Sequence, residues 1–220
     1  MTSRGLVAFD LDGSLVRIGS SWSWIHKLLG TLEAAKPNAD LYYAGKIDYR
    51  RWADLDVQLW RGVPLHRIEA AIQDGLVFVP GGENLIATLH GLGLKTAIVS
   101  SGLSVFADKA REALGVDVTR ANRLLTDAKG RIRGVDVRVA YDNKHEVLSS
   151  VAKELQIPLA RCIAIGDSRN DIPMFGRARY SIAFNPTDDD VAASASTVVR
   201  GENALDLLLP IRRFLESGSG

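Results

Sequence analysis

The 220-residue chain is predicted to be an α/β protein, with a doubly wound parallel sheet and a small helical segment inserted after the first strand. Three observations predict this class. Short apolar runs typical of buried parallel strands recur along the chain, and helical patterns with apolar residues three and four positions apart separate them. Residues 17–78, in contrast, contain helical pattern without a strand.

The first predicted strand, residues 6–10, is an apolar run that ends in a carboxylate and is followed by a turn at Gly13. The same pattern recurs further along the chain. The other predicted strands are residues 95–100, 162–167, 181–184 and 197–199. The predicted core helices are residues 83–90, 105–114, 144–155 and 204–215. Ligands bind beyond the carboxyl ends of the strands in such a sheet, so the polar residues that end these strands mark the candidate site.

Residues 17–78 are expected to lie over this site as a helical cap. Helical patterns cover residues 22–29, 49–60 and 65–72, and all four tryptophans lie in the segment. The sequence Pro80-Gly81-Gly82 marks the return to the core. The chain is thus predicted to consist of an α/β core of residues 1–16 and 79–216, a cap of residues 17–78, and a flexible tail of residues 217–220.

A second interruption of the alternation covers residues 121–140. Its centre, Asp127-Ala128-Lys129-Gly130, is typical of a hairpin turn. We therefore expect a short β excursion at the edge of the sheet.

Composition excludes several function classes. Twenty-seven basic and 26 acidic residues leave a net charge of +1, so no electrostatic feature favours nucleic acid or a membrane surface as the partner. The N-terminal apolar run is too short for a signal peptide or a membrane span. Cys162 is the only cysteine and cannot form an internal disulfide, so we expect a small buried residue and a cytoplasmic location. A monomer and a homodimer are equally compatible with the sequence.

Two carboxylates, Asp10 and Asp12, stand at the end of the first predicted strand. Both approach one site only where the backbone turns between them, which Gly13 permits. Carboxylates so close repel each other, and Mg²⁺, which binds one or two carboxylates together with phosphate oxygens and water, relieves this repulsion. Taken alone, the pair is equally consistent with a surface turn or a helix N-cap.

A second pair, Asp167 and Asp171, follows another buried strand in a loop that begins at Gly166. Two such pairs at strand ends of one sheet place four carboxylates at the same edge. This convergence favours a metal site over two unrelated turns.

Ser100, Ser101 and Gly102 end a third predicted strand before a helix, where N–H groups and hydroxyls can hold phosphate oxygens. An ordinary helix N-cap is the alternative interpretation. Lys144 begins a helix after a loop. A lysine there is usually a solvated surface charge, and only its association with the other groups makes it a candidate phosphate ligand.

These residues, in this order, resemble the four motifs of the haloacid dehalogenase (HAD) superfamily, and within it the phosphoserine phosphatase-like group. The motifs are met by residues 10–14, by Ser100, by Lys144 and by residues 166–171. Residues 121–124, Ala-Asn-Arg-Leu, also resemble a stretch of phosphoserine phosphatases between the second and third motifs. The resemblance covers nearly the whole chain and implies a Rossmann-like core with a C1-type helical cap.

The resemblance implies a Mg²⁺-dependent hydrolase of a small phosphorylated metabolite that acts through an aspartyl-phosphate intermediate. Asp10 is then the nucleophile, and Asp12 is first the general acid and afterwards the general base. Mg²⁺ is implied to be bound by Asp10, the backbone carbonyl of Asp12 and Asp167, with Asp171 in its first or second coordination shell. The implied phosphate-binding residues are Ser100, Ser101, Gly102, Lys144 and Asn170.

The sequence departs from phosphoserine phosphatases at two positions. A glutamate soon after the first motif and an arginine in a cap helix recognise the amino acid part of the substrate in those enzymes. Ungapped spacing places Gly19 at the glutamate position, and the alignment of residues 45–49 places Asp56 at the arginine position. Both departures argue against phosphoserine as the substrate.

Asp56 lies four residues from both Trp52 and Trp60, so it shares a helix face with two aromatic residues. The favoured interpretation is exposure or an ion pair with a neighbouring arginine; the alternative is recognition of an amine or hydroxyls on the leaving group. The tryptophans are likewise either cap core or substrate contacts. The neighbouring arginines are Arg50, Arg51 and Arg61. Four histidines without metal-ligand spacing are expected to be structural or surface residues: His26, His66, His90 and His145.

Three other functions fit parts of this pattern. A phosphotransferase that passes the aspartyl phosphate to an alcohol would carry the same motifs. A receiver-like signalling domain also uses a parallel sheet, an acidic cluster, a hydroxyl and a lysine, but it needs neither Asp12 nor a helical cap. A catalytically inactive phosphate-binding protein is disfavoured because every motif residue is present.

Overall fold

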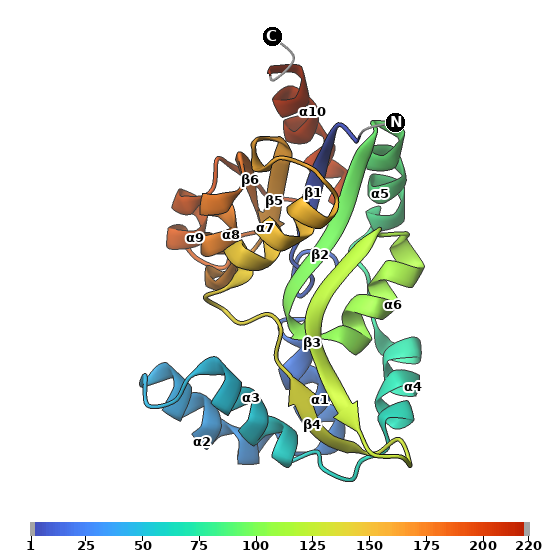
Figure 1. The fold of residues 1–220 in the computed structure, drawn as a ribbon, viewed down its shortest axis with the longest axis vertical. Coiled ribbons are helices and arrows are strands. Elements are labelled where there is room, and N and C mark those ends of the chain that lie inside the picture. The colour runs from blue at the N-terminus through green and yellow to red at the C-terminus, as the bar shows by residue number, and fades with distance from the viewer. Residues whose placement is uncertain (1–2, 218–220) are drawn as a thin grey trace.

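The computed structural model describes residues 3–217 (Figure 1). Its centre is a seven-stranded sheet of order β4-β3-β2-β1-β5-β6-β7, in which every neighbouring pair is parallel except β3 and β4. The strands are β1 (Gly5–Phe9), β2 (Leu94–Leu103), β3 (Val118–Thr126), β4 (Ile132–Asp136), β5 (Cys162–Gly166), β6 (Tyr180–Phe184) and β7 (Thr197–Val199). The predicted fold class, an α/β protein with a mostly parallel sheet and a helical region after the first strand, is confirmed.

Helices cover both faces of the sheet, and the alternation of side chains along β1 explains the two layers. Val7 and Phe9 belong to one apolar cluster with residues of α5, α6 and α10, whereas Leu6 and Ala8 belong to a second cluster with residues of α7, α8 and α9. These helices are α5 (Gly82–Gly91), α6 (Ser104–Leu114), α7 (Lys144–Glu154), α8 (Ile172–Arg177), α9 (Asp189–Ser194) and α10 (Leu208–Ser217). Short 3₁₀ turns precede β5, α8 and α10: η1 (Leu159–Arg161), η2 (Arg169–Asp171) and η3 (Ala204–Leu207).

The helical segment after β1 consists of α1 (Ser21–Leu29), α2 (Leu32–Tyr43), α3 (Tyr49–Gln58) and α4 (Leu65–Gly75). Its two ends lie side by side, because Arg17 N donates to Val77 O at 2.8 Å and Val79 N donates to Leu15 O at 2.9 Å. Helix α2, which continues through Pro37, has no counterpart among the predicted helices. Figure 1 shows this segment at the end of the molecule opposite α10.

The predicted β excursion is present as β3 and β4, and its turn is stabilised by Asp127, whose Oδ1 accepts hydrogen bonds from the backbone N–H groups of Lys129 and Arg131. It is more than an edge feature. Strand β3 begins at Val118, before the predicted start, and pairs in parallel with β2. The hairpin also binds the helical segment, since the backbone N–H group of Ile132 donates to Val63 O at 2.9 Å.

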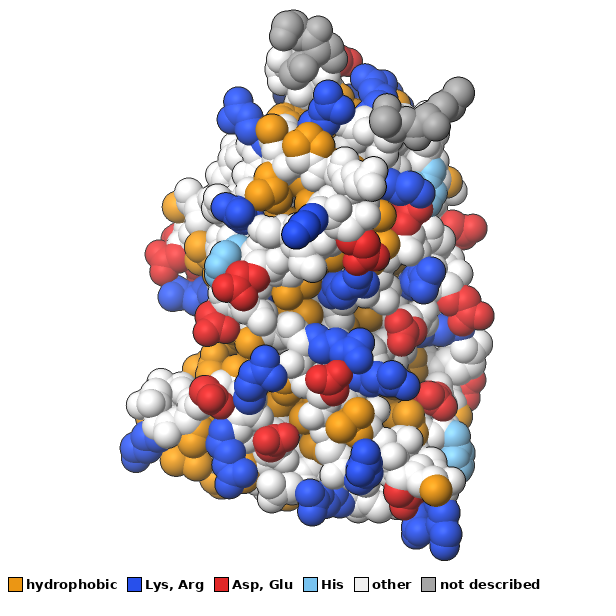
Figure 2. Space-filling view, in the orientation of Figure 1, with side chains coloured by type: hydrophobic (Ala, Val, Ile, Leu, Met, Phe, Trp, Pro, Cys, Tyr) orange, Lys and Arg blue, Asp and Glu red, His pale blue; other side chains and the backbone are white. Residues whose placement is uncertain are grey.

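The surface and termini agree with the composition. Acidic and basic side chains are interspersed on the face shown in Figure 2. Cys162 is buried in β5, as predicted. Within residues 3–217, none of the helices combines the length and apolar character needed to cross a membrane. Of the predicted flexible tail, Ser217 ends α10, and residues 218–220 lie outside the described part of the chain. The cytoplasmic location and the oligomeric state stay predictions.

Candidate functional site

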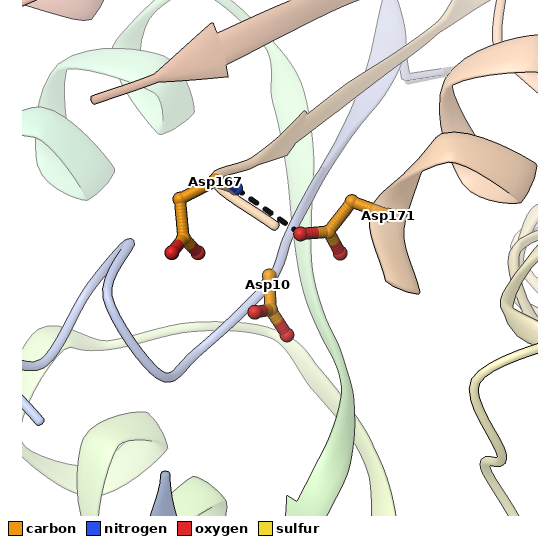
Figure 3. Close-up of side chains that lie close together, drawn as sticks. All are labelled: Asp10, Asp167 and Asp171. Atoms are coloured by element: carbon orange, nitrogen blue, oxygen red, sulfur yellow. Dashed lines mark hydrogen bonds between the residues drawn. The ribbon is translucent and has the colours of Figure 1, made fainter. Parts of the chain in front are cut away.

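Three carboxylates meet at the carboxyl ends of two adjacent strands. Asp10 follows β1 and Asp167 follows β5, while Asp171 ends the 3₁₀ turn that comes next. All three are buried, and one oxygen of each lies within 4.8 Å of the others. Figure 3 shows the group at the ends of these strands, with Asp171 accepting a hydrogen bond from the Asp167 backbone N–H group. Three of the four carboxylates predicted to converge are therefore in one group, and the side chain of Asp12 is not part of it.

Lys144 lies in the middle of this acidic group and is fully buried at the first position of α7. Its Nζ atom is 2.7 Å from Asp10 Oδ1 and 2.7 Å from Asp171 Oδ1, and it donates to Asn170 Oδ1 at 3.0 Å. A lysine is seldom buried without charged partners. The alternative interpretation of Lys144 as a solvated surface charge is therefore wrong.

The electrostatics leave an excess of negative charge. Burial, reinforced by the charge of Asp171, raises the pKa of Asp10 well above its ordinary value, although Lys144 opposes the shift. The same two causes raise the pKa of Asp167 to about 7. For Lys144, burial favours the neutral amine, but the charges of Asp10 and Asp171 outweigh it and raise the pKa. One lysine thus faces more carboxylates than it can neutralise.

A divalent cation fits this group, because its donors are all carboxylate oxygens, the ligands that Mg²⁺ prefers. The three carboxylates are not equivalent. Both oxygens of Asp171 already accept hydrogen bonds, Oδ1 from Lys144 and Oδ2 from the backbone N–H groups of Asp167 and Ser168. Asp10 Oδ2 accepts no hydrogen bond from the described residues. Asp10 and Asp167 are therefore better placed to bind a cation directly, and Asp171 holds them in position.

Asp12 has a separate environment on the side of the helical segment. Its Oδ2 accepts a hydrogen bond from the backbone N–H group of Ser21 at 2.7 Å, and its Oδ1 is shielded from solvent without a partner among the described residues. Burial of the carboxyl group raises the pKa of Asp12, and the Ser21 hydrogen bond only partly offsets this effect. Asp12 is thus suited to carry a proton.

The turn between these two aspartates depends on Gly13. Its φ of +87° is in the left-handed region that favours glycine, and a Cβ atom there would lie 2.5 Å from Asp167 Oδ2. The glycine therefore lets the first motif and the Asp167 loop approach each other closely.

The third strand end has a different local structure from the predicted one. Ser100, Ser101 and Gly102 still belong to β2, and α6 begins only at Ser104, so these residues are not a helix N-cap. The pairing of β2 with β3 shifts its register between Val99 and Leu103, which is typical of a bulge. Within it, the Gly102 N–H group donates to Ser100 Oγ at 3.0 Å.

The carbonyl oxygen of Ser101 forms a junction between the helical segment and the end of β2, which the sequence analysis did not predict. It accepts hydrogen bonds from Trp22 Nε1 at 3.1 Å, from Asn122 Nδ2 at 2.7 Å and from the Tyr49 hydroxyl. Asn170 Nδ2 also donates to Ser101 Oγ at 3.1 Å. The only sequence signal for this junction was the stretch of residues 121–124, which contains Asn122. Helices α1 and α3 are thereby fixed to the end of β2.

A cavity of about 350 Å³ is lined almost entirely by the helical segment, to which Tyr141 of the core is added. Among its lining residues are Gly19, Trp22, His26, Tyr49, Trp52 and Asp56. Of the four predicted specificity residues, Gly19, Trp52 and Asp56 therefore reach this cavity. Trp60 does not line it, because its side chain is fully buried and stacks on Trp22 with ring centroids 5.5 Å apart.

The favoured interpretation of Asp56 is wrong. The residue is buried with an exposed fraction of 4%, and no arginine of the described chain lies within ion-pairing distance. Its Oδ1 accepts a hydrogen bond from Asn38 at 2.8 Å, and its Oδ2 lies 3.3 Å from His26 Nε2. Arg50 instead donates to the backbone carbonyl of Val137. These partners come from α1 and α2. The spacing of residues within α3 does not reveal how those two helices pack against it.

Comparisons with known proteins agree with this geometry. The family model for haloacid dehalogenase-like hydrolases matches residues 7–176. The phosphoserine phosphatase of Methanocaldococcus jannaschii is 33% identical over 82% of this chain and 85% of its own length, and that of Idiomarina loihiensis is 32% identical over 94% and 93%. For the phosphoserine phosphatase of Vibrio cholerae the identity is 28%, and this chain spans only 60% of its length.

Solved structures show the same likeness. A phosphoserine phosphatase with a phospho-aspartyl intermediate analogue has a TM-score of 0.80 and 28% identity, with coverage of 94% of this chain and 99% of that one. A substrate-bound phosphoserine phosphatase complex has a TM-score of 0.81 and 27% identity, with coverage of 96% and 99%.

Proposed function

The chain belongs to the haloacid dehalogenase-like hydrolase family and is a phosphatase of the phosphoserine phosphatase-like group; we propose that it hydrolyses phosphate monoesters of a small alcohol through phosphorylation of Asp10. The observation that carries this proposal is the position of Lys144, 2.7 Å from both Asp10 and Asp171. A carboxylate that attacks a phosphate dianion brings negative charges together, so a buried cation at the nucleophile favours that reaction.

In the first step, a carboxylate oxygen of Asp10 forms a bond to phosphorus, and the bond between phosphorus and the leaving oxygen breaks. Asp12 donates its proton to the leaving oxygen, so the product departs as a neutral alcohol. The raised pKa of Asp12 supports this role, since the carboxyl group must be protonated when the reaction begins.

In the second step, water attacks the phosphorus of the aspartyl phosphate. Asp12 accepts a proton from this water, and the bond between phosphorus and Asp10 breaks, which releases inorganic phosphate and restores both carboxyl groups. One residue thus serves as acid and then as base. Its free Oδ1 atom is available for both transfers.

The remaining site residues are proposed to bind Mg²⁺ and the phosphate group. Asp10 and Asp167 are the proposed direct ligands of Mg²⁺, together with the Asp12 backbone carbonyl, and Asp171 positions them. When bound, the metal would supply positive charge to the phosphoryl group. The proposed phosphate-binding residues are Ser100, Ser101, Gly102, Lys144 and Asn170. Residues 17–78 are proposed to form the cap that encloses the leaving group, because they provide most of the cavity lining.

The test is hydrolysis of p-nitrophenyl phosphate by the purified chain with Mg²⁺ and with excess EDTA. We expect turnover with Mg²⁺, loss with EDTA, and loss in Asp10→Asn with an unchanged circular dichroism spectrum. Undiminished hydrolysis by Asp10→Asn would contradict the proposal. Product analysis with added acceptor alcohols distinguishes hydrolysis from phosphotransfer, because a phosphotransferase would form new phosphate esters in place of inorganic phosphate.

A further inference from the structure

The cavity is connected to the phosphoryl site through residues of the helical segment that line it and their chain neighbours. Gly19 and Ser20 line it, and the backbone N–H group of the next residue, Ser21, binds Asp12. Trp22 and Tyr49 also line it while they donate to the carbonyl oxygen of Ser101. A phosphate ester bound at Asp10 with its leaving oxygen near Asp12 would therefore extend its alcohol portion into this cavity.

Among the described residues, Asp56 is the only carboxylate that lines the cavity, and it is almost completely buried. Taking a carboxylate out of water is costly unless a cation or several hydrogen bonds compensate for it. Within residues 3–217, Lys36 is the one lining residue with a fixed positive charge. Its side chain is 61% exposed, and its Nζ lies 2.6 Å from Glu33 Oε2. It is thus occupied away from Asp56.

The partners of Asp56 carry no fixed positive charge. Asn38 donates through its side-chain amide, which carries no charge. The indole N–H group of Trp60 lies 3.1 Å from His26 Nδ1 and 3.3 Å from Thr31 Oγ1, and His26 Nδ1 is itself 2.8 Å from Thr31 Oγ1. His26 Nε2 faces Asp56 Oδ2 at 3.3 Å. Within the described chain, no lysine or arginine side chain forms an ion pair with Asp56.

Five aromatic residues form part of the remaining wall. Trp22, Tyr43, Tyr49, Trp52 and Tyr141 all line the cavity. Such rings attract cations through their π systems and also accommodate neutral apolar groups. The rings alone therefore do not indicate whether the cavity binds a cationic or a neutral group. The buried carboxylate does decide, because it attracts a cation and repels a second carboxylate.

We propose that this cavity selects phosphate esters whose alcohol carries a positively charged nitrogen, primary or quaternary, and no carboxylate. The inference depends on the proposed function for the reaction at phosphorus, but the charge preference belongs to Asp56. An ammonium group in the cavity would pair with Asp56 and lie among the aromatic side chains. A substrate with a carboxylate would find no free cation there.

The test uses pairs of esters that differ in one charge. Phosphocholine is compared with 3,3-dimethylbutyl phosphate, and phosphoethanolamine with propyl phosphate. We expect kcat/KM of at least one ammonium ester to exceed that of its neutral counterpart by about tenfold or more, which corresponds to about 1.4 kcal/mol. Phosphoethanolamine should also exceed O-phosphoserine. Equal values in both pairs, or a preference for O-phosphoserine, would overturn the proposal.

Asp56→Asn keeps the size of the side chain and removes the charge, and Asp54→Asn changes an exposed carboxylate on the same helix. We expect Asp56→Asn to bring the ratio within each pair close to one, and Asp54→Asn to leave it unchanged. The ratio does not depend on the fraction of folded protein. A variant Asp56→Asn that keeps the wild-type ratio would show that Asp56 has a structural role only.

Calorimetric titration separates this inference from the proposed function. Choline and ethanolamine are titrated into the wild-type protein beside their neutral isosteres, 3,3-dimethylbutan-1-ol and propan-1-ol. Tighter binding of the amines supports the cavity preference even if no ester is hydrolysed, and binding no tighter than that of the neutral alcohols contradicts it. Failure to hydrolyse p-nitrophenyl phosphate contradicts only the proposed reaction.

Discussion

The phosphoryl site and the cavity beside it use negative charge in opposite ways. In the phosphoryl site, several buried carboxylates surround Lys144, and their oxygens are within reach of a common cation. In the cavity, Asp56 has Asn38 and His26 as partners, neither of which carries a fixed charge, and aromatic neighbours. The first arrangement prepares a reaction at phosphorus, whereas the second suits recognition of a charged group. We therefore propose that chemistry and selectivity are carried by different parts of the chain.

Replacement of Lys144, the buried positive charge of the phosphoryl site, should have the largest effect. Lys144→Met leaves Asp10 and Asp171 as uncompensated buried carboxylates, so we expect the metal-free protein to lose about 3 kcal/mol or more of unfolding free energy near pH 8. Phosphatase activity should also be lost. Urea unfolding of the variant is compared with Lys153→Met, an exposed lysine on the same helix. A loss no greater than that of Lys153→Met would contradict our account of the charge balance.

Magnesium and pH should have linked effects on the phosphoryl site. Asp167 binds protons more tightly in the folded chain, where its pKa is about 7, than in the unfolded chain, where it is near 3.8. The metal-free protein should therefore lose stability as pH rises from about 4 to about 7, because the folded state then retains protons that the unfolded state has released. A Mg²⁺ concentration 100-fold above Kd should add about 2.7 kcal/mol at pH 8.

Thermal unfolding with and without Mg²⁺ at pH 5 and pH 8 measures this linkage. The stabilisation by Mg²⁺ should be smaller at pH 5, where protons compete for the same carboxylates. Equal stabilisation at both pH values would indicate that the metal binds elsewhere.

Gly13 in the phosphoryl site and Gly19 in the cavity wall should differ in their tolerance of a side chain. Gly13→Ala should cost about 1–2 kcal/mol for the left-handed backbone alone, with further loss from the contact with Asp167. At Gly19, in the cavity wall, an added methyl group would meet no atom within 4 Å and the backbone is not left-handed, so Gly19→Ala should leave stability nearly unchanged. Urea unfolding of both variants tests this. Equal losses would contradict the close approach at Gly13.

A small effect is expected at the Ser101 junction, which connects the phosphoryl site with the helical segment. Tyr49→Phe removes one of three donors to the Ser101 carbonyl, while Trp22 and Asn122 still hold it. A single hydrogen bond is worth about 1 kcal/mol, so kcat for p-nitrophenyl phosphate should fall several-fold and the protein should stay folded. Kinetic measurement on the variant tests this, and an unchanged kcat would show that the junction does not position the phosphate-binding residues.

Sequence reasoning predicted the phosphoryl site better than the cavity for a physical reason. Asp10 and Asp167 end buried parallel strands, and the carboxyl ends of adjacent strands must meet at one edge. The register of β1 with β5 thus follows from local pattern and fold class. The role of Lys144 could not be predicted without its burial, because the sequence does not show whether a lysine at the start of a helix faces solvent or the site.

The cavity depends on how helices of the inserted segment pack, which spacing within one helix does not determine. The partners of Asp56 come from α1 and from α2, and α2 was absent from the predicted helices. Of the two roles predicted for Trp60, the structure shows the packing one, since its ring is fully buried and stacks on Trp22. Similarly, the bulge in β2 that carries Ser100 depends on pairing with β3.

The most direct test of the central claim is detection of phosphate on Asp10. The purified protein is mixed with p-nitrophenyl phosphate and Mg²⁺, quenched in acid within the first turnovers, digested with pepsin at low pH and analysed by mass spectrometry. We predict one added phosphoryl group on the peptide that contains Asp10, and none in Asp10→Asn. A phosphoryl group on another residue, or substrate turnover without any phosphorylated peptide, would contradict the account.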